Sequence, residues 1–231
     1  ISAGSTGALL AGGLFILGRV QGIDRPALAT VYPILGKEPA LLVDAGANSE
    51  CKPNNLLEFA TMGSIYMEKV LSRKRPLVGL VNIGVEESKG TILTKAAYEL
   101  LTKSHLEFVG NVEARDIPSG ICDVIVADGF TGNVILKLSE GLAWKMMKTM
   151  KQRFTEGNVA KFGAVLLQSK LKSIKAEFDY SEYGGAPILG VKGAVLKMHG
   201  SSNAKAVKNA IFRAIPYVDG KVVETIQNSV L

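Results

Sequence analysis

Short apolar segments alternate with longer helical patterns along most of this chain, and this alternation constrains its fold more than any other feature. A strand, a helix and a second strand in succession are typical of parallel pairing, because the helix carries the chain back across the sheet. We therefore expect an α/β fold, with a mainly parallel sheet that has helices on both faces. The expected strands are 27–32, 39–44, 77–83, 106–109, 122–127 and 194–196, and the expected helices are 8–20, 56–71, 94–103, 134–154 and 204–215.

Polar turns rich in glycine stand where these strands end or where the helices begin. They cover 2–7, 44–48, 84–90, 128–133 and 198–203. Ligands of parallel α/β sheets bind at the C-terminal ends of the strands, so we expect these turns to converge on one edge of the sheet. A turn that opens a helix offers free backbone N–H groups, which suit an anion such as phosphate. Ordinary capping of the helices by Ser and Asn is the alternative interpretation.

The composition is that of a globular chain. Its 231 residues are 47% hydrophobic and 21% charged, which excludes a disordered protein. No apolar run reaches the roughly 18 residues that a membrane span needs. Cys51 and Cys122 stand in no metal or redox spacing, so we expect reduced thiols and no metal site. The chain opens at Ile1 with a glycine-rich turn and no strand before it, and we expect a natural N-terminal part to precede it.

Positive charge is concentrated between Trp144 and Asp179. This segment holds eight basic and two acidic residues, a net charge of +6 that equals the net charge of the whole chain. Within it, apolar residues form one stripe of an amphipathic helix over 159–178, with a break expected near Gly163. One interpretation is a surface helix packed on the core. The other is a dimer or membrane-surface helix, or a docking face for an acidic protein. Nucleic acid is the least expected partner, because few aromatic residues and no nucleic-acid motif accompany the lysines.

Several motifs together carry a resemblance to a known family. The segments are 2–8, 128–134 with Lys137 and Glu140-Gly141, 179–187, and 199–205, with further matching stretches at 22–29, 44–53 and 82–90. In combination they resemble the phosphate acyltransferases of bacterial phospholipid synthesis (the PlsX type). Ser5 departs from the family's frequent Asn at that position. The resemblance covers essentially the whole chain.

The resemblance implies a fold similar to the phosphotransacetylases and to the isocitrate and isopropylmalate dehydrogenases. Residues 1–231 would be the C-terminal two thirds of the acyltransferase, with a basic helical segment at about 144–179. The family is a homodimer that transfers a long-chain acyl group reversibly from acyl carrier protein to inorganic phosphate. The acyl phosphate formed serves membrane phospholipid synthesis. A cytoplasmic protein with peripheral contact at the inner face of the cell membrane is implied, without a cofactor; no glycine fingerprint for a nicotinamide is present.

The mechanistic hypothesis is direct attack of bound phosphate on the acyl thioester, without a covalent acyl-enzyme. His199 is expected to protonate the leaving thiolate, and Asn133 and Lys137, one turn apart on one helix face, are expected to reach the developing charge. The expected phosphate or substrate ligands are Thr6, Gly7, Lys89, Asp128, Gly132, Ser201, Ser202 and Asn203. The expected contacts to the carrier protein or membrane are Lys170, Lys172 and Lys175.

Each of these assignments has a structural alternative. His199 would then bond only a backbone group, Lys137 would be a solvated helix lysine, and Asp128 would cap its turn. Cys51 and Cys122 are expected to be bystanders. Two other functions also remain open: a phosphotransacetylase acting on acetyl-coenzyme A, and a fragment that binds carrier protein or membrane without catalysis.

Overall fold

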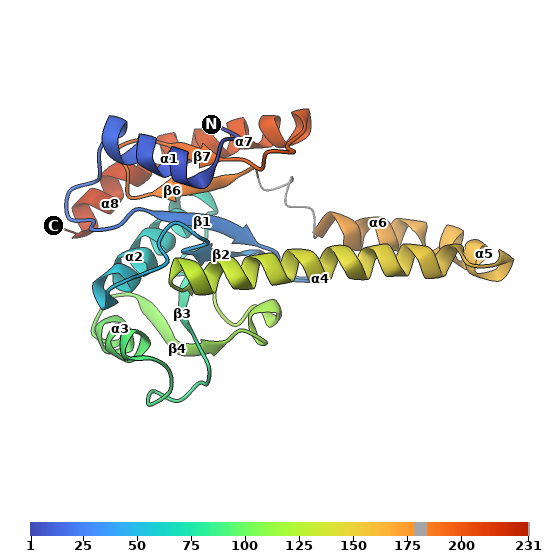
Figure 1. The fold of residues 1–231 in the computed structure, drawn as a ribbon, viewed down its shortest axis with the longest axis horizontal. Helices are drawn as coiled ribbons and strands as arrows, with labels where there is room; N and C mark the ends of the chain where they lie inside the picture. The colour runs from blue at the N-terminus through green and yellow to red at the C-terminus, as the bar shows by residue number, and fades with distance from the viewer. Residues whose placement is uncertain (178–183, 231) are drawn as a thin grey trace.

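The computed structural model describes residues 1–177 and 184–230. Within them, seven strands form one sheet in the order β4-β3-β5-β2-β1-β6-β7 (Figure 1). The strands are β1 (Ala27–Tyr32), β2 (Ala40–Val43), β3 (Leu77–Asn82), β4 (Glu107–Glu113), β5 (Val124–Val126), β6 (Ala186–Leu189) and β7 (Val195–Lys197). The α-helices are α1 (Thr6–Gly12), α2 (Pro53–Val70), α3 (Ile92–Thr102), α4 (Gly129–Thr155), α5 (Asn158–Leu166), α6 (Gln168–Glu177), α7 (Ala204–Asp219) and α8 (Val222–Val230), with a π-helical turn, η1 (Gly13–Leu17), and a 3-10 turn, η2 (Ile117–Ser119).

The sheet contains both parallel and antiparallel pairs. β5 is parallel to β2 and β3, and β4 is parallel to β3. β1 is antiparallel to β2 and β6, and β6 is antiparallel to β7. In the described part of the chain, β2 to β6 therefore all run in one direction, and β1 and β7 run in the other. The predicted α/β class with a mainly parallel sheet is confirmed.

Successive side chains of the buried strands face opposite sides of the sheet, as strand geometry requires. In β2, Leu41 and Val43 belong to one core cluster, and Ala40 and Leu42 belong to the other. The first cluster lies under α2, α3, α7 and α8, whereas the second is covered by α4 and α1. The prediction of helices on both faces is therefore confirmed. It also explains why these strands are continuous apolar runs in the sequence.

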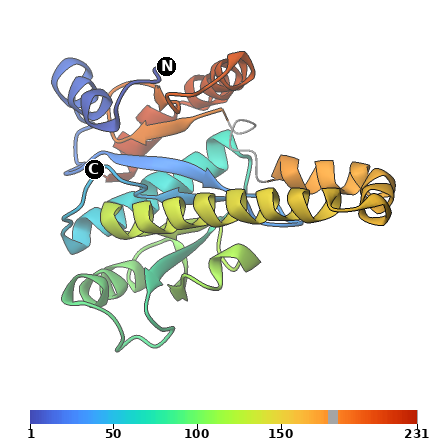
Figure 2. The ribbon, with the colours of Figure 1, turned by 45° about the vertical axis from the view of Figure 1, so that its right-hand side comes forward.

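Helix α4 is longer than the sheet that it crosses. Its 27 residues span about 40 Å, whereas the six residues of β1 span about 20 Å. The buried residues of α4 all lie in its first eight positions, and Ser139 is bonded to the Tyr32 hydroxyl of β1 at 2.8 Å. The rest of α4, from residue 140, projects with α5 and α6 beyond the sheet (Figures 1 and 2). We call residues 140–177 the arm. None of its described side chains is buried.

Several predicted boundaries need correction. α3 begins at Ile92, after its cap Thr91, rather than at 94, and the helix break within 159–178 falls at Leu167 rather than at Gly163. β6 was not among the expected strands, and its first two residues, Ala186 and Pro187, directly follow Gly184 and Gly185. Proline is tolerated there because β6 pairs with β1 only from Ile188 onward. The last expected helix ends at residue 215, so α8 (Val222–Val230) was not predicted. Residues 179–183 of the family motif lie outside the described residues.

Gly132 shows how closely α4 approaches the sheet. A Cβ at this position would overlap the carbonyl oxygen of Asp44 at the end of β2. Asp44 O belongs to fixed backbone, so a side chain at position 132 would have to push α4 away. Gly141, nine residues further along α4, has no neighbouring atom within 4 Å of the equivalent position.

We predict that Gly132→Ala lowers the free energy of unfolding by about 2 kcal/mol or more, since its methyl group has no space. Gly141→Ala is the matched control and is expected to be neutral or to stabilise the helix by up to about 1 kcal/mol. Urea denaturation followed by circular dichroism measures both. Equal midpoints for the two variants would contradict the close packing of α4 on β2.

Candidate active site

The buried carboxylate of Asp44 organises the turn that follows β2. Its Oδ1 accepts hydrogen bonds from the backbone N–H groups of Leu28, Gly46 and Ala47 at 2.9–3.1 Å. Its Oδ2 accepts bonds from the backbone and side-chain nitrogens of Asn48 at 2.7 and 2.9 Å. Burial raises the pKa of Asp44, and these donors oppose the rise. The carboxylate is thus enclosed, and its role is to hold the turn.

The N-terminus of α4 packs on this turn. Gly129 N donates to Asn48 O at 2.7 Å, and a Cβ on Gly129 would lie only 2.6 Å from that oxygen. Asp128 accepts bonds from Thr131 N at 2.9 Å and from Thr131 Oγ1 at 2.7 Å. Asp128 is therefore the N-cap of α4, which agrees with the alternative interpretation that this residue caps its turn. The Asn133 side chain lies beside Gly46, with its nearest atoms 3.4 Å from where a Cβ would be.

Lys89 lies in the loop that follows β3, and β3 is the neighbour of β5 in the sheet. Two buried asparagines hold the backbone of this loop. Asn82 Nδ2 donates to Lys89 O at 3.2 Å, and Asn111 Nδ2 donates to Glu86 O at 2.9 Å. The Lys89 side chain itself is exposed. Lys89, Asp128, Gly132 and Asn133 therefore belong to loops or helix starts at the same edge of the sheet, which we call the Asp44 edge.

The turn before α7 is closed by local hydrogen bonds. Asn203 Oδ1 accepts a bond from Ala206 N at 3.0 Å, so Asn203 is the N-cap of α7. His199 Nδ1 lies 2.6 Å from Ser201 Oγ and accepts a bond from Ser201 N at 3.2 Å. Because Nδ1 accepts this backbone bond, the ring proton of neutral His199 is on Nε2 and faces away from Ser201. Ser202 is partly exposed.

The start of α1 lies beside this turn. Ser2 forms a parallel bridge with Lys197, with Ser2 N donating to Leu196 O at 3.0 Å and Met198 N donating to Ser2 O at 2.8 Å. Both segments then enter helices, with Ser5 as the N-cap of α1. Thr6 and Gly7, in the first turn of α1, thus begin at the same edge as Ser201, Ser202 and Asn203. We call this the His199 edge.

The expectation that all the polar turns converge on one edge is wrong. β2, β3 and β5 end at the Asp44 edge, whereas β7 runs antiparallel to them and ends at the other. Counted through the paired registers, Lys197 at the end of β7 lies two residues from the level of Asp44, which is about 7 Å along the strands. The predicted residues fall into two groups: Lys89, Asp128, Gly132, Asn133 and Lys137 belong to the elements at or leading from the Asp44 edge, and Thr6, Gly7, His199, Ser201, Ser202 and Asn203 belong to the His199 edge.

This division changes the chemistry that one chain can perform. Lys137 lies on α4 about 12 Å from its first residue, and its Nζ is paired with Glu140 Oε2 at 2.8 Å. His199 and Asn133 belong to turns that follow strands of opposite direction, β7 and β5. Roles for these residues, and their joint action on one thioester, stay predictions.

The two thiols lie in environments that disfavour ionisation. Burial, with Asp44 and Asp128 nearby, raises the pKa of Cys51 to about 11. Burial raises the pKa of Cys122 to about 12. Neither is an activated nucleophile. Among the residues described, no group of three or more His, Cys, Asp or Glu side chains gathers where a metal ion would bind.

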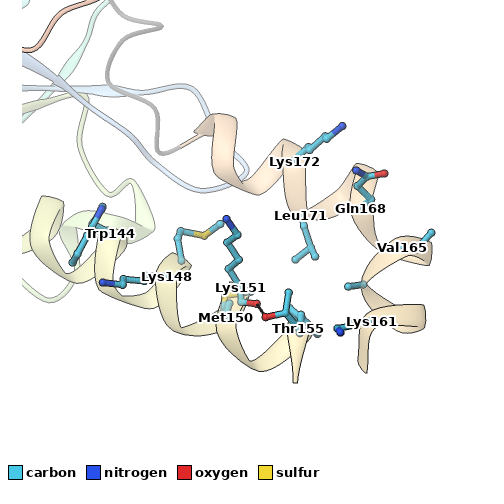
Figure 3. A pocket seen from close by; sticks show the side chains of 13 residues that line it. Trp144, Lys148, Met150, Lys151, Thr155, Lys161, Val165, Gln168, Leu171 and Lys172 are labelled. Carbon is cyan, nitrogen blue, oxygen red and sulfur yellow. Dashed lines mark hydrogen bonds between the residues drawn. The ribbon is translucent and has the colours of Figure 1, made fainter. Parts of the chain in front are cut away.

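The arm contains a groove between α4 and the α5–α6 pair, with a volume of about 730 Å³ (Figure 3). Its apolar lining includes Trp144 and Leu171. The repeat of apolar side chains along α4 is visible in the sequence, but the fold-back of α5 and α6 over it is not. Lys172 lines the groove, Lys170 is exposed on the same helix, and the side chain of Lys175 lies outside the described part. The full lining is Trp144, Met147, Lys148, Met150, Lys151, Phe154, Thr155, Lys161, Ala164, Val165, Gln168, Leu171 and Lys172.

Solved structures with this arrangement of strands and helices define its class. The EutD phosphotransacetylase from Staphylococcus aureus aligns with 94% of this chain and 60% of its own, with a TM-score of 0.60 and 15% identity. A phosphotransacetylase from Streptococcus pyogenes aligns with 96% and 61%, with a TM-score of 0.58 and 16% identity. The chain therefore has the phosphotransacetylase type of α/β fold. The expected kinship with the dehydrogenases stays a prediction.

Sequence relatives identify the family. The model of the fatty acid synthesis protein family matches residues 1–225. The phosphate acyltransferase of Alkaliphilus oremlandii is 61% identical over 230 residues, and that of Clostridium tetani is 54% identical over 232 residues. These alignments cover the whole of this chain and 68% and 69% of the relatives. The chain belongs to the phosphate acyltransferase family, as its motifs predicted, and this is a family of enzymes. In the described part, no helix is both long and apolar enough to cross a bilayer.

We predict that native Cys51 reacts with iodoacetamide at pH 8 about 100-fold more slowly than an ordinary thiol, because its raised pKa leaves little thiolate. The rate is expected to rise tenfold per pH unit up to about pH 11. Mass spectrometry of a Cys122→Ser variant follows Cys51 alone, and the protein in urea is the control. Rapid native labelling at pH 8 would contradict the enclosed position of this thiol.

Proposed function

We propose that this chain carries out the transfer of a long-chain acyl group from acyl carrier protein to inorganic phosphate, reversibly, as part of a phosphate acyltransferase. Membership of the phosphate acyltransferase family supports the transfer of an acyl group to phosphate. The observation that supports a carrier protein as acyl donor is that the basic arm leaves the sheet on the side of the His199 edge (Figures 1 and 2). A phosphate at that edge and an acidic carrier on the arm would face the same side of the molecule.

The proposed phosphate site is the His199 edge. The turn before α7 and the start of α1 lie side by side there, and Thr6 and Ser202 have hydroxyl groups that can donate to an anion. Two of the predicted ligands are already engaged: Asp128 at the Asp44 edge caps α4, and Lys137, further along this helix, is paired with Glu140. The negative charge of the Asp128 carboxylate would also repel phosphate at the Asp44 edge, whereas the turn 198–203 has no acidic residue.

The proposed reaction is a direct displacement. A phosphate oxygen attacks the thioester carbonyl carbon, a C–O bond forms, and the C–S bond breaks as the tetrahedral oxyanion collapses. The carrier thiolate leaves and takes a proton. The imidazolium form of His199 is the proposed donor of that proton, through Nε2, and the ring is left as a neutral imidazole. The reverse reaction uses the same groups, with the carrier thiol losing its proton to the imidazole.

The arm is the proposed contact for the carrier protein. The lysines of its described side chains are exposed, and acyl carrier protein is acidic, so opposite charges would steer the encounter. Large apolar side chains are exposed at its tip, including Val159 at 88% and Phe162 at 67%. A peripheral membrane contact and a homodimer interface at these side chains are part of the proposal, with the protein in the cytoplasm. The remaining exposed apolar residues of α5 and α6 are Val165, Leu166, Leu167 and Ile174.

A phosphotransacetylase-like activity on acyl-coenzyme A is the second candidate. It is favoured only by the fold, which the structures from Staphylococcus aureus and Streptococcus pyogenes share. Formation of acetyl phosphate from acetyl-coenzyme A, with no reaction of a palmitoyl carrier, would support it over the first. A chain that binds carrier or membrane without turnover is the third, and absence of both reactions would support it.

We predict that the protein releases free carrier from palmitoyl acyl carrier protein only when phosphate is present. Ser202→Ala should raise the KM for phosphate about tenfold, because one hydrogen bond to a charged ligand is lost. Ser88→Ala, an exposed serine in the loop at the Asp44 edge, is the control and should behave as wild type. A raised phosphate KM in Asn133→Ala, with Ser202→Ala unchanged, would move the site to the Asp44 edge.

The role of the arm has a separate test. Lys170→Glu combined with Lys172→Glu should raise the KM for the acyl carrier severalfold while leaving the KM for phosphate unchanged. Lys74→Glu with Lys103→Glu makes the same change in net charge at exposed sites away from the arm. Identical carrier KM values and identical binding to anionic vesicles in the two double variants would rule out the arm as the contact surface.

A further inference from the structure

We propose that three residues of the Asp44 edge position Lys89 to bind a phosphate group, and that they act through Lys89 without touching the substrate themselves. They are Asn82 at the end of β3, Gly84 in the loop that follows, and Asn111 in β4. The phosphate group is either inorganic phosphate or the phosphodiester that links the acyl thioester to its carrier protein. In naming these two sources the inference rests on the proposed function.

The loop 83–90, which carries Lys89, lies far from the turn before α7. It joins β3 to α3, and β3 is five strands away from β7 in the sheet. At about 4.8 Å per strand, this is about 24 Å across the sheet. Figure 1 shows the loop at the end of the sheet away from α1 and α7. Lys89 and the His199 edge therefore cannot hold one and the same phosphate group.

The backbone of Lys89 is fixed at both of its polar atoms. Lys89 N donates to Glu86 O at 3.1 Å, and Lys89 O accepts a bond from Asn82 Nδ2 at 3.2 Å. Glu86 O also accepts a bond from Asn111 Nδ2 at 2.9 Å. Asn111 thus orients the carbonyl group that holds Lys89 N, and Asn82 holds the other side of the same residue directly.

Gly84 gives the side chain of Lys89 its path across the loop. A Cβ at Gly84 would lie 3.1 Å from Lys89 Cγ, 3.6 Å from Lys89 Cδ and 2.8 Å from Glu86 Oε2. The methylene groups of Lys89 therefore lie close over the glycine backbone. In the described part of the chain, the Lys89 ammonium group forms no ion pair. The lysine is held along its length and has its charge available to an anion.

Stability alone does not account for Asn111. This side chain is only 6% exposed, and its Oδ1 accepts no hydrogen bond within the described residues. Burying an amide with one polar atom unpaired is unfavourable, and an apolar side chain of the same size would avoid that cost. The bond to Glu86 O is what the buried amide contributes. We take the placement of the loop, and with it of Lys89, as the reason for the amide.

Kinetics of carrier release from palmitoyl acyl carrier protein test the inference. Lys89→Gln should raise the KM for the carrier about tenfold, because a charged contact to its phosphodiester is lost. The KM for phosphate should not change, since inorganic phosphate is proposed at the His199 edge. Asn111→Leu should raise the KM for the carrier roughly threefold. In the Lys89→Gln background it should have no further effect, because it acts through Lys89.

A second variant keeps the test valid if Asn111→Leu does not fold. Gly84→Ala displaces the Lys89 side chain within an exposed loop, so it should raise the KM for the carrier and leave the urea midpoint unchanged. Gly12→Ala is its control, with no atom within 4 Å of the added methyl group. Asn55→Leu is the control for Asn111→Leu, because Asn55 is also buried and bonded to backbone and side-chain groups. It should lower the urea midpoint without changing either KM.

The possible results separate this inference from the proposed function. A rise in the phosphate KM, in place of the carrier KM, would support the positioning of Lys89 and would move the inorganic phosphate to the Asp44 edge. Unchanged KM values in Lys89→Gln or Gly84→Ala would overturn the inference alone. Full additivity of Asn111→Leu and Lys89→Gln would also overturn it, because it would mean that Asn111 acts independently.

A binding measurement covers the case in which the chain has no turnover. Inorganic phosphate and dimethyl phosphate, a model of the phosphodiester, are titrated separately into the ¹⁵N-labelled protein. A saturable shift of the Gly90 amide with either probe, lost in Lys89→Gln and weakened in Asn111→Leu, would support the inference and reject only the proposed function. No shift with either probe would overturn the inference.

Discussion

The buried carboxylate of Asp44 is the interaction on which the rest of the arrangement depends. It receives five N–H bonds, from the strand β1, from the turn after β2 and from the Asn48 side chain. The same turn provides Asn48 O and Asp44 O, against which Gly129 and Gly132 bring α4 into close contact. An unsatisfied carboxylate at this depth would be strongly unfavourable, so the turn and the helix start are fixed together.

That fixed start determines where the arm lies. α4 begins at the Asp44 edge, crosses the sheet over β1 and β2, and continues for about half its length past the other end. The arm therefore leaves the molecule on the side of the His199 edge (Figure 1). An acyl donor bound to the arm and a phosphate at the turn before α7 would then lie on one side of the fold.

The sequence was sufficient for the elements that depend on local patterns. β1 was predicted at its observed bounds because it is a continuous apolar run, and β2 and β3 were predicted to within one residue. The cap at Asn203 was visible as a polar residue directly before a predicted helix, whereas α4 was predicted only from 134 and begins at Gly129 after its cap Asp128. Strand direction was not visible, because the antiparallel placement of β1 and β7 depends on pairing with distant strands. For this reason the predicted single site divides into two edges, and the groove of the arm, which needs α5 and α6 folded back on α4, was missed.

The central claim is that phosphate binds at the His199 edge rather than at the Asp44 edge. Titration of the ¹⁵N-labelled protein with inorganic phosphate, followed by amide chemical shifts, tests it most directly. The account predicts saturable shifts at the amides of Ser201, Ser202 and Thr6, with those of Gly46 and Asn133 unchanged. Shifts confined to Gly46, Gly129 and Asn133 would contradict it and would assign the anion to the start of α4.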